Sequence, residues 1–176
     1  MFVSTVITKQ RKKLFSMSLT LSTQPTARYN TIKHVLLVDD NPDNIALTRR
    51  ALAHAGFAVH LDVLQRNEAI LARIDADLTQ QQPSYDLILI DMNLSKGGGF
   101  ELIRSIRQQL PAMHTPIVVI SSTNHEQDVL RSYESGASSL IHKAADFTEY
   151  AQTLREVCAY WLNLNISPIH KIRAAS

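Results

Sequence analysis

Three acids, a hydroxyl and an ammonium each follow a short apolar run of this sequence. Asp39 and Asp40 come directly after HVLLV, and Asp91 follows DLILI. Ser121 follows IVVI, and Lys143 follows the shorter run LIH. If these runs are strands of one parallel sheet, their carboxyl ends face the same way. We therefore expect the five side chains to surround one crevice.

Carboxylates that share a crevice raise one another's pKa, and a hard divalent cation removes that cost. Mg²⁺ favours oxygen ligands in octahedral geometry and keeps several waters. We predict that Asp40 and Asp91 bind it directly, that Asp39 reaches it through water, and that the backbone carbonyl of Asn93 completes the protein's share. The metal and Lys143 could then neutralise an arriving phosphoryl group, with Asp91 as its nucleophile. Ser121 could hydrogen-bond a phosphoryl oxygen.

Strands and helices are predicted to alternate five times along the chain. The predicted strands are 34–38, 57–63, 86–90, 117–120 and 140–142, and an amphipathic helix is expected after each. Strands that are apolar without alternation are typical of a parallel sheet covered by helices on both faces. The sequence therefore predicts an α/β fold with a doubly wound, open, parallel sheet.

Polar residues mark the expected starts of the helices. Those expected to begin the first, second, fourth and last helices are Asn41 (before Pro42), Asn67, Asn124 (with Gln127 as its capping-box partner) and Asp146 (with Glu149). Gly56 is expected to end the first helix.

Charge divides the chain into a basic head and a mildly acidic body. The formal net charge is +2, but residues 1–33 contain six bases, no Asp and no Glu: Lys9, Arg11, Lys12, Lys13, Arg28 and Lys33. We expect a flexible basic N-terminal extension at 1–31, one domain at 32–165 and a tail at 166–176.

No basic face or reading helix points to nucleic acid, and no apolar run is long enough to span a membrane. The single cysteine, Cys158, suits a reducing compartment, and we expect a cytoplasmic protein.

Four stretches resemble the receiver domain of two-component response regulators, the fold of the chemotaxis response regulator. They are VLLVDDN (35–41), DLILIDMNL (86–94), PIVVISS (116–122) and GASSLIHK (136–143). The resemblance implies a flavodoxin-like sheet of strand order 2-1-3-4-5. It implies Asp91 as phospho-acceptor, Asp39, Asp40 and Asn93 as the Mg²⁺ site, Ser121 as switch hydroxyl and Lys143 as phosphoryl partner. It also implies a sensor histidine kinase as phosphoryl donor and a downstream phosphotransfer protein as a candidate partner.

A closer resemblance is to the small response regulators that partner phytochrome-type kinases. SSTNHEQDVLRSYESGA (121–137), DFTEY (146–150) and YWL (160–162) are similar to that subgroup. We therefore expect a stand-alone, non-enzymatic receiver for a phytochrome-like sensor.

Three positions depart from the family's pattern. Ser95 and Ala144 stand where proline is usual, and Leu140 stands where an aromatic switch residue is usual. A cis bond before alanine costs about 3–4 kcal/mol, so we expect the Lys143–Ala144 bond to be trans. Without a rotating ring, any signal must travel through backbone and helix shifts.

The end of the chain carries more apolar residues than one helical face can bury: Tyr160, Trp161, Leu162, Leu164 and Ile166. We expect a homodimer through the fourth helix, the fifth strand and the fifth helix. The alternative is that this segment packs on its own domain.

Two other functions compete with the phospho-switch. An adaptor that has lost phosphorylation would explain Ser95, Ala144 and Leu140. An aspartate-nucleophile phosphatase would need its nucleophile after the first strand and a second Asp two residues on, where this chain has Asn93.

Overall fold

Five parallel strands form one sheet in the order β2-β1-β3-β4-β5. The computed structural model describes residues 32–65, 71–73, 76, 85–94, 98–109, 114–123 and 125–167. The strands are β1 (Lys33–Val38), β2 (Val59–Leu64), β3 (Leu87–Asp91), β4 (Ile117–Ser121) and β5 (Ser139–His142). The predicted flavodoxin-like, doubly wound sheet and its strand order are confirmed.

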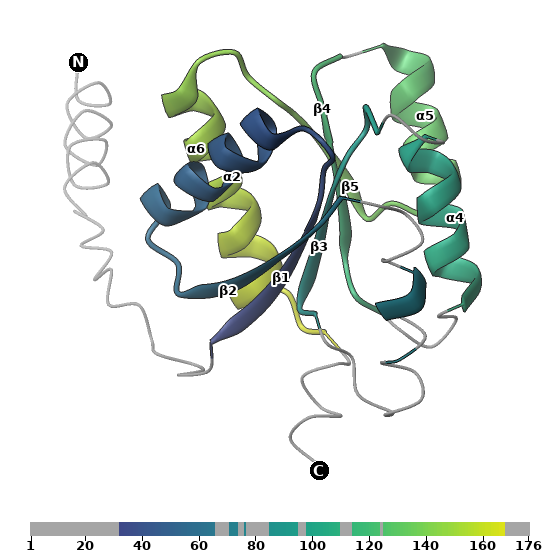
Figure 1. Ribbon diagram of the computed structural model, residues 1–176, viewed down its shortest axis with the longest axis horizontal. Coiled ribbons are helices and arrows are strands. Elements are labelled where there is room, and N and C mark those ends of the chain that lie inside the picture. Colours follow the sequence, from purple (N-terminus) through teal and green to yellow (C-terminus); the bar gives the residue numbers. More distant parts are fainter. Residues whose placement is uncertain are drawn as a thin grey trace, which may run out of the picture. The chain divides into compact units, whose positions relative to one another are not determined.

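Helices cover both faces of the sheet (Figure 1). α2 (Pro42–His54) and α6 (Phe147–Cys158) lie on one face, and α4 (Gly99–Gln109) and α5 (Glu126–Glu134) lie on the other. A π-helical segment, η1 (Ala159–Leu164), continues α6. Helical residues are also described at 71–73 and 76, within the predicted second helix, whose expected cap Asn67 lies outside the described residues.

The interior strand β1 explains why the apolar runs do not alternate. Val35 and Leu37 join the core beneath α2 and α6, whereas Leu36 and Val38 join the core beneath α4. All four side chains are fully buried. A strand covered on both faces needs apolar residues at every position.

The predicted ends of α2 and the start of α6 agree with the structure. The Asn41 side chain accepts hydrogen bonds from the backbone N–H groups of Asp43 and Asn44. Gly56 follows the helix with a φ of +77°, a conformation that favours glycine. At α6, the Asp146 carboxylate accepts from the backbone N–H of Glu149 at 2.9 Å.

The predicted start of the fourth helix was wrong. Its N-cap is His125, which makes no side-chain capping bond, and Asn124 lies outside the described residues. Gln127 is consequently the second helical residue and not the third, so it does not hold the capping-box position. The third position belongs to Asp128, whose carboxylate accepts from the Thr123 hydroxyl at 3.1 Å.

Other predictions differ in smaller ways or lie outside the described residues. β2 begins at Val59 and not Phe57, because its ladder with β1 starts at the pair Lys33↔Val59. The predicted extension at 1–31 and most of the predicted tail at 166–176 fall outside the described residues.

A guanidinium ties α4 to the turn that leads into β5. Arg107 donates from Nε to the carbonyl of Gly136 at 2.8 Å and from Nη1 to the carbonyl of Thr115 at 3.1 Å. Its Nη2 donates to Ser138 Oγ at 3.3 Å. Gly136 has a φ of +102°, and a Cβ there would lie 2.8 Å from Arg107 Cγ. The turn therefore requires glycine.

The apolar end of the chain is divided between core and surface. Leu162 is buried in the core beneath α2 and α6, so at this residue the segment packs on its own domain, as the alternative expected. Leu162 lies four residues after the buried Cys158, on the same helical face. Tyr160, Leu164 and Ile166 are exposed. Among the helices that the structure describes, none has the length and apolar character of a membrane span.

Candidate functional site

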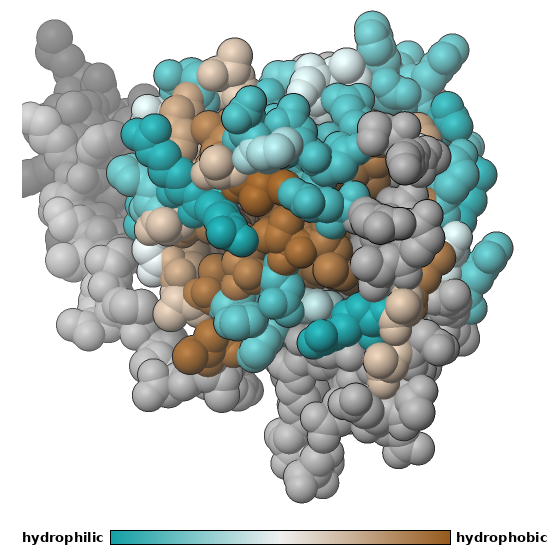
Figure 2. Space-filling view, in the orientation of Figure 1, coloured by the Kyte–Doolittle hydropathy of each residue, from teal (hydrophilic) through white to brown (hydrophobic). Residues whose placement is uncertain are grey.

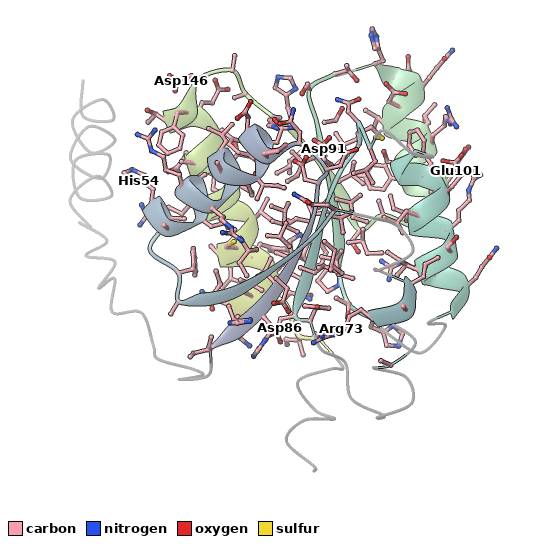
Figure 3. The ribbon with its side chains drawn as sticks, in the orientation of Figure 1. His54, Arg73, Asp86, Asp91, Glu101 and Asp146 are labelled. Atoms are coloured by element: carbon pink, nitrogen blue, oxygen red, sulfur yellow. The ribbon has the colours of Figure 1, made fainter. Side chains whose placement is uncertain are left out.

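The residues expected at the crevice lie at one edge of the sheet. Asp39 directly follows β1, Asp91 ends β3 and Ser121 ends β4. Lys143 follows β5, and its backbone N–H donates to the carbonyl of Ser121 at 2.7 Å. Figure 3 shows Asp91 at this end of the sheet, with Asp86 at the opposite end.

Local backbone bonds fix the two buried carboxylates. Asp39 Oδ1 accepts from the backbone N–H of Asn41 at 2.9 Å. Asp91 Oδ2 accepts from the backbone N–H of Asn93 at 3.0 Å. Each acid therefore holds one carboxylate oxygen against the turn that follows it. Both acids are 2 % exposed.

The charges of this site act on one another. Burial is the largest cause that raises the pKa of Asp91, and the charge of Asp39 raises it further. Lys143 acts in the opposite direction, and Asp40 adds a small increase. Burial likewise raises the pKa of Asp39, against the backbone bond from Asn41 and the charge of Lys143. Since electrostatic effects fall with distance, these mutual effects agree with the positions of Asp39, Asp91 and Lys143 at the carboxyl ends of β1, β3 and β5.

The donor set fits a hard divalent cation held partly by water. The available groups are carboxylate oxygens and a backbone carbonyl, which suit Mg²⁺ or Mn²⁺ and not a soft metal. Within the described ranges, no three His, Cys, Asp or Glu side chains form a ready metal group. A site with two directly bound carboxylates, one carbonyl and waters does not need such a group. Burial first, and neighbouring acids second, raise the pKa values of Asp39 and Asp91, and a cation bound beside the carboxylates would favour their charged form.

Ser121 and Lys143 are positioned by the backbone around them. Ser121 is buried, and its hydroxyl donates to the backbone carbonyl of Thr123 at 3.0 Å. Lys143 is half-buried, and the peptide bond to Ala144 is trans, as expected. Ala144 packs into the core beneath α2 and α6. A small apolar residue thus anchors the chain directly after the lysine.

A phenol also lies near the site, in the stretch DFTEY, and the sequence motifs assign it no role there. The Tyr150 hydroxyl lies 2.9 Å from Thr48 Oγ1, joining α6 to α2. Burial raises the pKa of Tyr150 to about 12, and the charges of Asp39 and Asp91 add to the rise. Tyr150 therefore stays protonated beneath the acids. Its helical spacing predicted burial but gave no sign of its nearness to the site.

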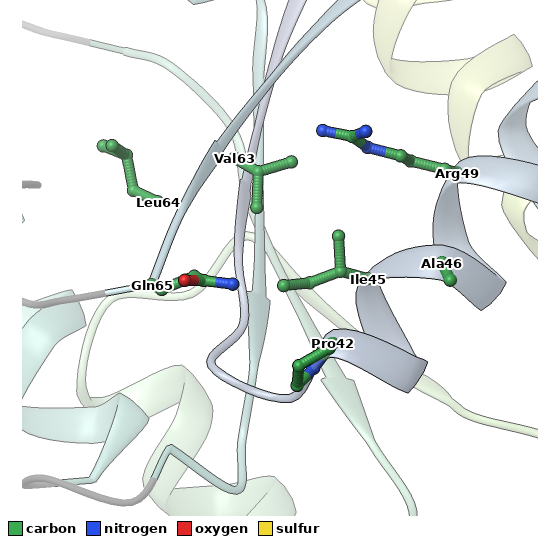
Figure 4. A pocket seen from close by; sticks show the side chains of 7 residues that line it. All are labelled: Pro42, Ile45, Ala46, Arg49, Val63, Leu64 and Gln65. Carbon is green, nitrogen blue, oxygen red and sulfur yellow. The ribbon is translucent and has the colours of Figure 1, made fainter.

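A groove between α2 and β2 borders the same edge of the sheet (Figure 4). The residues that line it are Pro42, Ile45, Ala46, Arg49, Val63, Leu64 and Gln65. Figure 2 shows hydrophobic surface in the middle of this face of the molecule, surrounded by hydrophilic residues. The carbonyl of Leu64 accepts from the backbone N–H of Asp39 at 3.3 Å, which connects the groove wall to the site.

A parallel sheet of this order, with buried acids after β1 and β3 and a lysine after β5, defines a receiver. The model of the family "Response regulator receiver domain" matches residues 35–155. The chain belongs to this family.

Two curated relatives are similar over most of their length. The response regulator Rcp1 of Synechocystis sp. is 28% identical over 139 residues, which cover 76% of this chain and 91% of the relative. A probable methanogenesis regulatory protein, FilR2 of Methanothrix harundinacea, is 28% identical over 134 residues, covering 76% of this chain and 86% of the relative.

Solved structures give the same result. The phosphorylated cyanobacterial phytochrome response regulator RcpA has a TM-score of 0.67 and 26% identity, over 78% of this chain and 99% of that one. The Mn²⁺-bound form of the response regulator Rcp1 has a TM-score of 0.64 and 26% identity, over 77% of this chain and 99% of that one.

Proposed function

We propose that this chain is a phospho-switch that accepts a phosphoryl group on Asp91 and signals through protein contacts. The observation that carries the proposal is the buried Asp91 carboxylate at the end of β3, within the fields of Asp39, Asp40 and Lys143. A buried carboxylate that its neighbours repel becomes more stable when a cation binds beside it. The same cation would offset the negative charge of an arriving phosphoryl group. The phosphorylated RcpA shares this fold over 78% of the chain, which supports the same chemistry here.

We assign the metal ligands from the chemistry of the donor set. Asp40 and Asp91 would bind Mg²⁺ directly, the carbonyl of Asn93 would add a third oxygen, and Asp39 would act through water. The Mn²⁺-bound form of Rcp1 supports a divalent cation in a related protein. When bound, the cation supplies positive charge to the phosphoryl oxygens.

Three residues of the chain would each have a separate role in the transfer of the phosphoryl group. An oxygen of Asp91 forms a bond to phosphorus while the bond from phosphorus to the donor breaks and its electron pair leaves with the donor. Lys143 balances charge on the transferred group, and Ser121 donates a hydrogen bond to one of its oxygens. No general base is needed, because the nucleophile is already a carboxylate.

We propose a sensor histidine kinase as the donor, and a phytochrome-type kinase in particular. Support for the kinase class comes from the family, and support for the photosensor comes from the likeness to Rcp1 and RcpA. The two proteins are matched over 91% and 99% of their lengths, which also supports action as a stand-alone receiver.

Acetyl phosphate separates the switch from an adaptor. With Mg²⁺, a switch gains one base-labile phosphoryl group, mapped to Asp91 by mass spectrometry of the full-length chain. A phosphorylation-independent adaptor, which the residues Ser95, Ala144 and Leu140 favour, gains none. Steady turnover without a stable adduct would instead identify a phosphatase. The expected result is a single adduct that requires the cation.

We also propose a homodimer through α5, β5 and α6, because α5 exposes two large apolar side chains. Leu130 is 56% exposed and Tyr133 is 51% exposed. Sedimentation at micromolar concentration is expected to show a dimer that Leu130→Asp converts to monomer. Ile32→Asp, which changes an exposed apolar residue directly before β1, serves as the matched control and is expected to leave the dimer intact. A wild-type monomer, both with and without phosphorylation, would remove this proposal.

A further inference from the structure

A chain of hydrogen bonds leads from the switch hydroxyl to the first turn of α5. Ser121 donates to the carbonyl of Thr123 at 3.0 Å, and the Thr123 backbone N–H donates back to Ser121 Oγ at 3.1 Å. The Thr123 hydroxyl lies 3.3 Å from Ser121 Oγ and donates to Asp128 Oδ2 at 3.1 Å. Asp128 and Val129 in turn donate their backbone N–H groups to the carbonyl of His125. The hydroxyl of Ser121, the following loop and α5 are therefore connected.

The Ser121 hydroxyl has one proton to donate, and the Thr123 carbonyl accepts it. Donation to a phosphoryl oxygen requires Ser121 to leave that carbonyl. When it leaves, the backbone N–H of Thr123 loses its acceptor as well. Both backbone groups of Thr123 then need new partners, while the bond from its hydroxyl to Asp128 holds this residue against α5.

We propose that Thr123 is a positioning residue that, through Asp128, holds Ser121 in the conformation that does not donate to a phosphoryl group. This inference rests on the proposed function, since it concerns the same phosphorylation site. The bond between Thr123 and Asp128 stabilises the unphosphorylated conformation, and phosphorylation must disturb the first turn of α5. In a chain with Leu140 at the position of the usual aromatic switch, this connection carries the signal to the helix that exposes Leu130 and Tyr133.

A double-mutant cycle tests the connection. The probe is beryllofluoride with Mg²⁺, which imitates a phosphoryl group on a carboxylate, and its affinity is measured by calorimetry on the full-length chain. Thr123→Val and Asp128→Ala each remove the hydrogen bond, so each is expected to tighten binding about three- to tenfold. In the Thr123→Val background, Asp128→Ala is expected to add less than about twofold, because the shared bond is already gone.

Conservative variants distinguish the loss of the hydrogen bond between Thr123 and Asp128 from general damage to the fold. Thr123→Ser keeps the donor and Asp128→Asn keeps an acceptor, so both are expected to bind the probe as the wild type does. Thr153→Val is the matched control, because it removes a hydroxyl that donates to the Glu149 carbonyl in α6 at 3.0 Å. Weaker binding by Thr123→Val, equal effects of Asp128→Ala in both backgrounds, or an equal effect of Thr153→Val would overturn the inference.

Hydrogen exchange of the ligand-free chain gives a second measurement that needs no phosphoryl mimic. The amides of Asp128 and Val129 are expected to exchange faster in Thr123→Val than in the wild type or in Thr123→Ser. Unchanged exchange contradicts the connection, whatever the probe does. If the wild type binds no beryllofluoride while the exchange difference is present, the proposed function fails and the connection stands.

Discussion

An Asp91→Asn variant is expected to take up at least about 100-fold less phosphoryl group than the wild type when it is incubated with acetyl phosphate and Mg²⁺. The amide keeps the shape of the side chain and its acceptor for the backbone N–H of Asn93. It lacks the anionic oxygen that would attack phosphorus. The loss is therefore chemical, and folding is retained. Intact-mass spectrometry after a fixed incubation measures the modified fraction.

Asp146→Asn is the matched control for this variant. Asp146 lies at the same end of the molecule as Asp91 (Figure 3), and asparagine caps a helix as well as aspartate does. This control is expected to be phosphorylated at the wild-type rate. Modification of Asp91→Asn at that rate would move the acceptor to another residue and remove the proposed role of Asp91.

The same substitution is expected to stabilise the metal-free chain at neutral pH. Burial and the charge of Asp39 both raise the pKa of Asp91, so its ionised form costs stability. A neutral side chain of equal size removes that cost. We expect a gain of about 1–2 kcal/mol in the free energy of unfolding, or a rise of about 2–8 °C in the melting temperature.

The stability of the wild type relative to Asp91→Asn is expected to fall as the pH rises. Because the folded-state pKa of Asp91 is raised above its ordinary value of 3.8, the folded chain binds the proton more tightly than the unfolded chain. This proton stabilises the wild type at low pH, and the contribution is lost as the pH rises through the folded-state pKa. Wild type and Asp91→Asn are therefore expected to be similar in acid and to diverge toward neutrality. Calorimetric melting between these limits measures the divergence.

Mg²⁺ is expected to reverse the order of stability. A ligand at one hundred times its dissociation constant stabilises the folded state by about 2.7 kcal/mol, which exceeds the expected gain of about 1–2 kcal/mol, and the variant lacks a charged ligand for it. Asp146→Asn should respond to Mg²⁺ as the wild type does. A neutral-pH melting temperature of Asp91→Asn below that of the wild type, without metal, would contradict the electrostatic account of the site.

The sequence predicted the central strands and their terminal acids because those positions obey strong local rules. Leu36 and Leu37 are buried on opposite faces of β1, so the run had to be continuously apolar. A strand of this kind ends where a charge appears, which placed Asp39 and Asp91 correctly at one edge of the sheet. Their assigned roles stay proposals, since position alone does not demonstrate chemistry.

The start of α5 could not be predicted by the same rules. Asn124 with Gln127 has the composition of a capping box, but the first turn takes its side-chain bond from Thr123 through Asp128. Thr123 lies two residues before the N-cap His125, and no sequence pattern marks a hydroxyl at that position as the partner of a residue in the first turn. Tyr150 presents a similar limit, because helical spacing predicts burial and does not say which charges lie near a buried phenol.

Arg107 has a consequence for the chemistry at the far edge of the sheet. It binds the turn at Gly136 that precedes β5, while Ala144 anchors the chain where β5 has ended. Lys143 lies between these two fixed points, so both hold its backbone in place. If Asp91 accepts a phosphoryl group as proposed, a guanidinium and a glycine turn remote from the reaction would help to position the lysine that faces it.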